Sequence, residues 1–198
     1  LVKLHMKKIL PSLLAIVALV FTGCIQMEDT LTLNGDGSGT WKFKLTLGPQ
    51  MVAMMSSGMN ADKDTMFDEK KFRAAVAKVK GARVVSYSSK ETDGSLNIRG
   101  EIAFTSIVEL YRSSAFEKQL NWEFKEVDGK LEATISKPMM GGGQNSPQMD
   151  FNALKALMLG MKIDRTLVLP NNVISANGKE KAGKQARWIF EFTKTTTE

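Results

Sequence analysis

The chain has little of the residue types on which many catalytic and metal sites depend. It has 198 residues but only one cysteine, Cys24, and one histidine, His5. After Cys24 there can be no Ser–His or Cys–His catalysis, no zinc site built on these residues and no internal disulfide. An enzyme would have to use carboxylates, lysine or tyrosine, and no motif for these is visible. We therefore expect no enzymatic activity, no cofactor and no metal site.

The charge of the chain is only mildly positive. Lysine and arginine total 27, aspartate and glutamate total 21, and the formal net charge is +6. No segment is dense enough in basic residues to form a nucleic-acid-binding surface, so we expect no nucleic-acid partner. The hydrophobic share of 43% and the charged share of 24% are typical of a globular domain with a packed core.

The single cysteine stands directly behind an apolar segment near the N-terminus. Lys7 and Lys8 precede an apolar run at 9–21, and two small residues separate that run from Cys24. A basic start, a short apolar run and a small-residue cleavage point are typical of a secretory signal. The run is shorter than the roughly 20 residues that a membrane-spanning helix needs. An ordinary secretory signal with an accidental cysteine is the alternative to a role for Cys24.

The stretch Phe21-Thr22-Gly23-Cys24 resembles the lipobox of bacterial lipoproteins. This resemblance implies that the Cys24 sulfur receives a diacylglyceryl group and that the signal is cut before Cys24. The new N-terminus would usually be acylated too, and two or three chains give stable anchoring. We expect residues 1–23 to be removed and 24–198 to form one domain in the cell envelope. It would be anchored on the periplasmic side of the inner or outer membrane, or on the cell surface.

Turn motifs divide most of the chain into hairpins. The stretch 34–39 (NGDGSG), Asp93-Gly94 and Asp128-Gly129 each separate two strand-like runs. The strands are expected at 27–33, 40–47, 83–89, 96–104, 121–127, 130–136, 165–169 and 185–193. Helices are expected at 49–59, 68–80, 106–113 and 150–161, and a flexible glycine-rich loop near 138–149. This order predicts an α+β fold, an antiparallel sheet built of hairpins with helices packed on one face and without parallel βαβ alternation.

The glycine-rich stretch 34–39 could be mistaken for a calcium loop. It lacks the EF-hand spacing, and the twelfth position, where a glutamate would bind calcium, is Leu45. It is no phosphate-binding loop either, because no Gly-Lys-Ser/Thr follows it. We expect a hairpin turn.

Methionine is abundant, with 12 residues in the chain. Helical spacing places four methionines on one face of the helix at 49–59, and apolar residues also line one side of the helix at 150–161. Such residues could form core, an adaptable surface for a lipid chain, or a Cu(I) site, although copper sites usually add histidine or cysteine. As candidate ligand-binding residues we select Met51, Met54, Met55, Met59, Leu154, Met158 and Met161.

The expected helix at 68–80 carries basic residues away from its apolar side. These are Lys70, Lys71, Arg73, Lys78 and Lys80. They would form either an ordinary solvated face or a surface that docks on anionic headgroups.

Both ends of the region after the signal resemble the LppM-like bacterial lipoproteins. The stretch 24–47, CIQMEDTLTLNGDGSGTWKFKLTL, is similar to their opening strand, turn and strand. The stretch 166–191, TLVLPNNVISANGKEKAGKQARWIFE, is similar to their closing segment. The resemblance implies a lipid-anchored α+β domain and, for parts of the family, binding of lipids or glycolipids. Many relatives add a C-terminal transmembrane helix, which we do not expect here.

The function expected from these features is a lipid-anchored envelope protein whose domain binds a hydrophobic ligand or an envelope partner. The ligand would be a lipid or glycolipid. The alternative is a non-enzymatic assembly lipoprotein that docks on an envelope protein complex. A carboxylate-dependent enzyme is a more distant alternative, which would need two acidic side chains to converge in a cleft.

Overall fold

The computed structural model describes residues 25–58, 67–113, 122–127, 130–135 and 159–192. In chain order the elements are β1 (Ile25–Leu33), β2 (Gly39–Leu47), α2 (Pro49–Gly58), α4 (Glu69–Ala77), β3 (Ala82–Thr92), β4 (Ser95–Phe104), α5 (Ile107–Arg112), β5 (Trp122–Val127), β6 (Lys130–Ile135), β7 (Lys162–Val168), β8 (Glu180–Ala182) and β9 (Gln185–Glu191). The fold is thus mostly sheet, with few helices.

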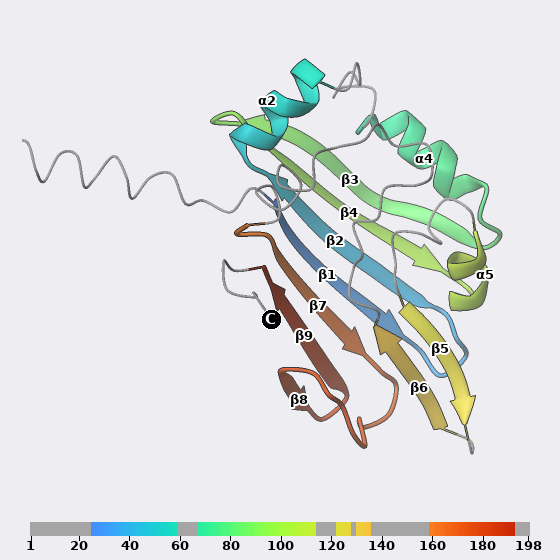
Figure 1. The fold of residues 1–198 in the computed structure, drawn as a ribbon. Helices are drawn as coiled ribbons and strands as arrows, with labels where there is room; N and C mark the ends of the chain where they lie inside the picture. Colours follow the sequence, from blue (N-terminus) through green and yellow to red (C-terminus); the bar gives the residue numbers. More distant parts are fainter. Residues whose placement is uncertain (1–24, 59–66, 114–121, 128–129, 136–158, 193–198) are drawn as a thin grey trace, which may run out of the picture.

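Seven strands form one twisted sheet in the order β3-β4-β2-β1-β7-β9-β8, and β5 and β6 form a separate hairpin (Figure 1). The hairpins predicted from the turn motifs are the pairs β1–β2, β3–β4 and β5–β6. Antiparallel pairs dominate the sheet, as those hairpins predicted. The sequence analysis did not predict that β1 and β7 pair in parallel near the centre of the sheet.

The turn between β1 and β2 is closed by its own polar side chains. The Asp36 carboxylate accepts hydrogen bonds from the Ser38 backbone N–H (3.0 Å) and from the Ser38 hydroxyl (2.6 Å). These bonds hold the pKa of Asp36 below its ordinary value. The backbone N–H of Asn34 donates to the Ser38 carbonyl at 2.8 Å. The stretch therefore folds as a hairpin turn.

One face of the sheet carries two apolar clusters, because the side chains of a strand alternate between its two faces. The Leu31 cluster comprises Leu31, Leu33, Trp41, Val76, Val79, Ile102, Phe104, Leu110 and Leu167. The Met55 cluster comprises Ile25, Leu47, Val52, Met55, Leu96, Ile98, Met161 and Ile163. In β1 the cluster residues alternate with polar ones and therefore point to one face of the sheet. The cluster residues of β2, β4 and β7 are level with β1 positions of that same face, directly or through β2, so all of them share it.

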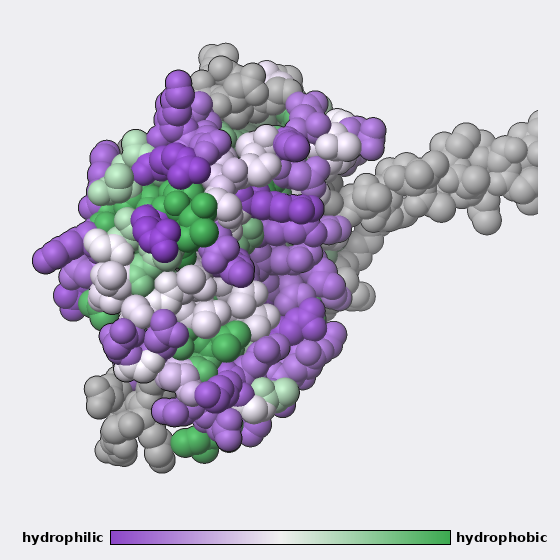
Figure 2. Space-filling view, turned by 180° about the vertical axis from the view of Figure 1, so that it is seen from behind, coloured by the Kyte–Doolittle hydropathy of each residue, from purple (hydrophilic) through white to green (hydrophobic). Residues whose placement is uncertain are grey.

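The other face of the sheet, here called the open face, carries polar residues. Glu28, Thr30 and Thr32 of β1 lie on it between the buried positions of that strand. Lys44 reaches across to Glu28, with 3.2 Å between the ammonium and the carboxylate. Seen from behind, the molecule presents a largely hydrophilic surface with smaller hydrophobic areas (Figure 2).

Helix α4 forms where an N-cap and an apolar stripe coincide. The Asp68 carboxylate accepts a hydrogen bond from the Lys71 N–H at 2.8 Å, which satisfies one of the free donors of the first turn. Phe72 stacks on Tyr87 of β3 with 4.6 Å between ring centroids, and Val76 is fully buried. The helix ends at Ala77, earlier than predicted, and Gly81 turns the chain with φ +76°.

Two features of the C-terminal part differ from what the sequence predicted. The predicted helix at 150–161 does not extend to its predicted end, because Leu159 and Gly160 form a turn and Met161 leads directly into β7. Gly160 has φ +80°, a conformation that favours glycine and stops a helix. The short strand β8 was not predicted. Residues 150–158 and the loop predicted at 138–149 lie outside the described residues.

In the part of the chain that the structure describes, none of the helices is both long and apolar enough to cross a bilayer.

Candidate functional site

Some of the methionines predicted to bind a ligand belong to the Met55 cluster. Met55 of α2 and Met161 at the start of β7 are both buried in this cluster. Met51 packs against its edge, and Met54 is half-buried. The structure thus brings two helical methionines and Met161 to one end of the sheet. Met59, Leu154, Met158 and Cys24 lie outside the described residues.

Helix α2 reaches the cluster because it starts directly after β2. Leu47 ends β2, Gly48 follows, and the Val52 N–H donates to the Gly48 carbonyl at 3.1 Å to close the first helical turn. Val52 and Met55 are three residues apart and therefore share a helical face, which they bury against the sheet. Met51 and Met54 lie beside that face and keep part of their surface exposed.

Met161, the residue directly before β7, belongs to the same cluster although it is far from α2 in the sequence. The Phe192 N–H donates to the Met161 carbonyl at 3.0 Å, and the Gly160 N–H donates to the Phe192 carbonyl at 2.9 Å. These two bonds extend the β7–β9 pairing and point the Met161 side chain into the core, where it is 5% exposed. Met161 is therefore a sheet-end residue, and the prediction that it lies on a helix is wrong.

A buried ion pair lies between the Met55 cluster and the Leu31 cluster. Asp29 of β1 and Arg165 of β7 are paired positions of the parallel strand pair, and 3.3 Å separates Arg165 Nε from Asp29 Oδ2. Both side chains are almost fully buried. Within the described residues, no hydrogen bond reaches either carboxylate oxygen of Asp29.

Burial raises the pKa of Asp29 to about 6. The loss of hydration is the largest cause, the Arg165 guanidinium opposes it by favouring the charged carboxylate, and the nearby Asp164 carboxylate adds to the rise. Raised pKa values of carboxylates occur at functional sites and at structural ion pairs alike. Since Asp29 faces apolar clusters on both sides, we assign this pair to the core of the domain.

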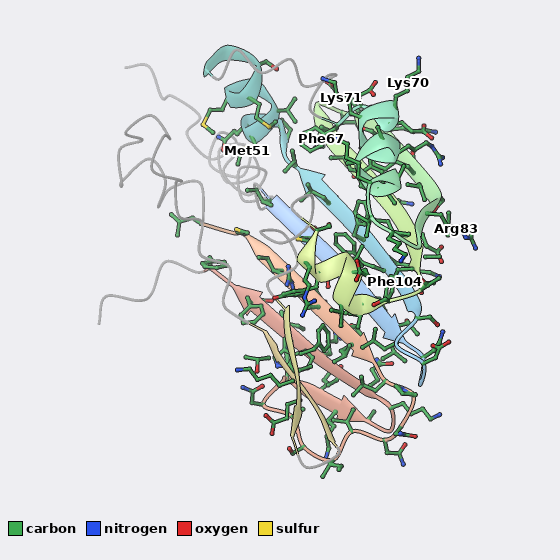
Figure 3. All side chains as sticks on the ribbon, turned by 90° about the vertical axis from the view of Figure 1, so that its right-hand side faces the viewer. Met51, Phe67, Lys70, Lys71, Arg83 and Phe104 are labelled. Atoms are coloured by element: carbon green, nitrogen blue, oxygen red, sulfur yellow. The ribbon has the colours of Figure 1, made fainter. Side chains whose placement is uncertain are left out.

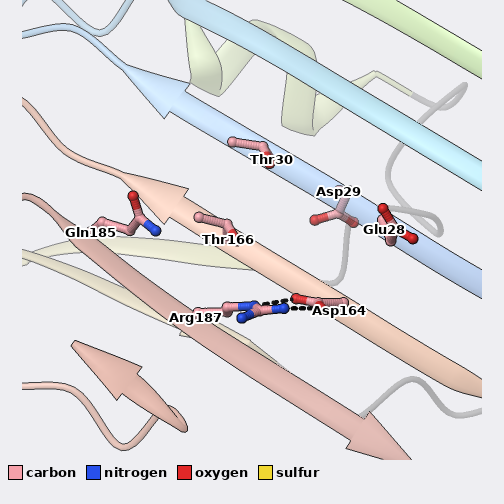
Figure 4. Close-up of a pocket in the computed structure, with 7 residues that line it drawn as sticks. All are labelled: Glu28, Asp29, Thr30, Asp164, Thr166, Gln185 and Arg187. Atoms are coloured by element: carbon pink, nitrogen blue, oxygen red, sulfur yellow. Dashed lines mark hydrogen bonds and ion pairs between the residues drawn. The ribbon is translucent and has the colours of Figure 1, made fainter. Parts of the chain in front are cut away.

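The open face has a shallow polar depression of about 250 Å³. It is lined by Glu28, Asp29, Thr30, Asp164, Thr166, Gln185 and Arg187 (Figure 4). The Arg187 guanidinium holds both oxygens of Asp164, at 2.8 Å from Nε and 2.5 Å from Nη2, and it also contacts Glu180 at 3.2 Å. These carboxylates raise the pKa of Arg187. The positive charge of the guanidinium is already balanced by these two carboxylates, so the depression is no anion-binding site.

The basic residues of α4 lie on an exposed flank beside β3. Lys70, Lys71, Lys78 and Lys80 are exposed, and Arg83 at the start of β3 adds a fifth cation. Figure 3 shows Lys70, Lys71 and Arg83 projecting from this side of the molecule. Among the described residues no ion pair involves any of these five, whereas Arg73 is paired with Glu69 at 2.8 Å. We call these five residues the α4 basic surface.

The described residues contain no group of three or more histidine, cysteine, aspartate or glutamate side chains placed to hold a metal ion.

Asp29 and Arg165 were not among the predicted site residues, although both leave a signal in the hydrophobic pattern of their strands. Asp29 alternates with Met27 and Leu31, and Arg165 alternates with Ile163 and Leu167. A charged residue at an apolar position of a period-two pattern points toward the core. Two such residues of opposite charge on separate strands are candidates for a buried pair.

No family model matches the chain, and no curated protein matches it. Among solved structures, the chain is similar to the folded domain of the Mycobacterium tuberculosis LppM protein, determined by NMR. The sequence identity is 13%, the alignment covers 86% of this chain and 84% of that chain, and the TM-score is 0.48. The resemblance to LppM-like lipoproteins stays an expectation.

Proposed function

We propose that the protein is a lipid-anchored envelope protein, tethered through Cys24, whose domain binds an apolar ligand at the Met55 cluster. The ligand would be an acyl chain of a lipid or glycolipid. It would lie between α2 and the sheet, on the face that the helices are proposed to cover. The proposal assigns a binding role and no catalytic step.

One observation carries this proposal. Ile25, the residue after Cys24, is 7% exposed and belongs to the same apolar cluster as Met55 and Met161. The methionine-bearing end of the sheet is therefore the end at which a lipid on Cys24 would be attached. A lipid that leaves the membrane would meet this end first.

The side chains of the cluster suit a ligand of variable shape. Methionine is unbranched and polarisable, and it repacks around different apolar partners at low cost. Met51 is half-buried and packs against the margin of the cluster, where an acyl chain would first make contact. Met54, also half-buried, is three residues further along α2 and so neighbours Met51 on the helix surface. Phe67, Phe190 and Phe192 also pack against the cluster and add apolar surface.

Photolabelling tests the site. The acylated protein is placed in vesicles that contain a phospholipid with a diazirine on its acyl chain, and the labelled peptides are mapped after irradiation. We expect label on α2 and at Met161, and we expect Met54→Glu to lower it several-fold. The control variant Lys44→Ala changes a partly exposed side chain of the open face and should leave the labelling unchanged. Label confined to other segments would contradict the proposal.

The assembly role keeps one specific observation in its favour. β3 is an edge strand of eleven residues in the described sheet, and Val85 at its bulge is 44% exposed. Hydrophobic residues gather toward the β3 side in Figure 2. Edge strands offer free N–H and C=O groups to a partner strand. If this role holds, Val85→Lys would abolish crosslinking to an envelope protein, and Met54→Glu would not.

A further inference from the structure

We propose that the sheet stands end-on against the phospholipid bilayer, with the end at Ile25 touching the lipid headgroups. The turn at 34–39 then points away from the membrane. This orientation rests on the acylation of Cys24 in the proposed function, but it does not depend on the apolar ligand.

No spacer separates Cys24 from the first strand of the domain. β1 begins at Ile25, which pairs with Leu47 of β2 and is buried in the Met55 cluster. One peptide unit, about 3.8 Å between Cα atoms, joins Ile25 to the residue that carries the lipid. A long linker would let the domain turn freely above the membrane. Here the anchored residue is followed at once by a fixed strand, so the end of the sheet is held at the headgroups.

The strand registers define which groups share that end. Ile25 is level with Leu47 of β2, which is level with Leu96 of β4. On the other side Gln26 is level with Lys162 of β7. The β3–β4 turn at Asp93-Gly94 lies at the same end. A Cβ on Gly94 would lie 3.5 Å from Pro49 Cβ, so this turn touches the start of α2.

The surface at this end of the sheet combines apolar side chains with charges of both signs, which suits contact with the headgroup region of a bilayer. Met51, Leu159 and Phe192 are half-buried apolar side chains. Lys162 and Glu191 form an exposed pair at 3.5 Å, and Lys90 and Asp93 are exposed at the same end of the sheet on its β3 side. Since both charge signs are present, the contact needs no anionic lipid. The tether supplies the attachment, and we expect the orientation to persist in zwitterionic bilayers and at high salt.

The opposite end of the sheet lies far from the anchor. β1 has nine residues, Ile25–Leu33, and its eight steps of about 3.3 Å each span roughly 26 Å. Figure 3 shows Met51 and Phe67 near one end, and Phe104 and Arg83 toward the other. Gly39 pairs with Phe104, which pairs with Ala82, so Arg83 belongs to the far end.

The positions of these residues distinguish the end-on orientation from docking of the α4 basic surface on the membrane. The α4 basic surface extends to the far end, where Lys78, Lys80 and Arg83 lie. Docking of this surface on the protein's own membrane would require the sheet to lie flat. In the end-on orientation these cations remain in solution. The two orientations therefore differ most in the height of Arg83 above the bilayer.

Fluorescence quenching measures that height. Acylation blocks Cys24, the only native cysteine, so introduced cysteines can be labelled singly in the full acylated protein. We choose Thr92→Cys beside the β3–β4 turn, Gly35→Cys in the β1–β2 turn and Arg83→Cys. All three positions are exposed, and a Cβ on Gly35 meets nothing within 4 Å. Each labelled protein is placed in phosphatidylcholine vesicles that carry a nitroxide on the lipid headgroup.

We expect the label at Thr92→Cys to be quenched several-fold more strongly than the labels at Gly35→Cys and Arg83→Cys. The difference should remain at high salt. Equal quenching at all three positions would overturn the orientation. Quenching at Arg83→Cys as strong as at Thr92→Cys would mean that the domain lies flat on the bilayer. That result would also overturn the end-on orientation. The photolabelling at α2 is an independent readout, so failure of ligand binding and failure of the orientation are distinguishable.

Discussion

Asp29 and Arg165 form an ion pair of 3.3 Å across β1 and β7, the parallel strand pair of the described sheet. Both side chains are buried, and apolar clusters lie on both sides of them. Arg165 is level with Asp29, which is level with Phe43 of β2, so the pair lies in the middle of the sheet. It joins two segments that are far apart in the chain.

Removal of Asp29 should be costly, because the Arg165 guanidinium cannot give up its charge and then stays buried without its carboxylate partner. We expect Asp29→Leu to lower the free energy of unfolding by about 3–5 kcal/mol in denaturant titrations at neutral pH. The double variant Asp29→Leu/Arg165→Met removes both charges and should lose much less than Asp29→Leu alone. A double variant as unstable as the single one would show that the pair is not the source of the effect.

The raised pKa of Asp29 predicts a pH dependence of stability. The native state holds a proton on Asp29 up to a pKa of about 6, whereas the reference value is 3.8. The folded state is therefore favoured by protonation below about pH 4, and this stabilisation is lost as the pH rises through 6. Two pKa units correspond to about 3 kcal/mol. Denaturant titrations from pH 4 to 7 should show the loss, and Asp29→Asn should remove this contribution.

Gly100 is required by a close contact across the sheet. It pairs with Phe43, and a Cβ at this position would lie 2.4 Å from the end of the Phe43 ring. Gly100→Ala should therefore cost about 1–3 kcal/mol of stability through overpacking. Gly35→Ala is the matched control, since a Cβ there meets nothing within 4 Å. Similar thermal midpoints for both variants would contradict this explanation.

The N-cap of α4 should contribute measurably to stability. Asp68→Ala removes the carboxylate that accepts the Lys71 N–H, and we expect a loss of about 1 kcal/mol. Lys70→Ala, in the same first turn but exposed and outside any described ion pair, should change the free energy of unfolding by less than about 0.5 kcal/mol. Equal losses in both variants would argue against a capping role.

The sequence predicted well those elements whose signals are local. The Asp93-Gly94 and Asp128-Gly129 turns marked two hairpins, and the spacing of Phe72, Ala75 and Val76 marked α4. The parallel pairing of β1 with β7 leaves no local signal, because no turn residues connect the two strands. The three-residue strand β8 is too short for a periodic pattern.

The positions of the candidate ligand-binding residues in the fold were predicted only in part. Helical spacing grouped Met51, Met54 and Met55 correctly on one helix, α2. The same pattern also placed Met161 on a helix, but the turn at Gly160 makes it the residue before β7. Met161 and Met55 come together in one cluster because of the order of strands in the sheet. The proximity of both to Ile25, and hence to the anchor, could not be read from spacing along the chain.

The most direct measurement of the central claim is the identification of what the domain holds. A chain that begins at Ile25 is exported to the same compartment without the acylated cysteine, purified and extracted with organic solvent, and the extract is analysed by mass spectrometry. We predict a lipid or glycolipid in stoichiometric amount, and less of it in Met54→Glu than in Lys44→Ala. A folded domain with an empty extract would contradict the assignment of the Met55 cluster as a ligand site.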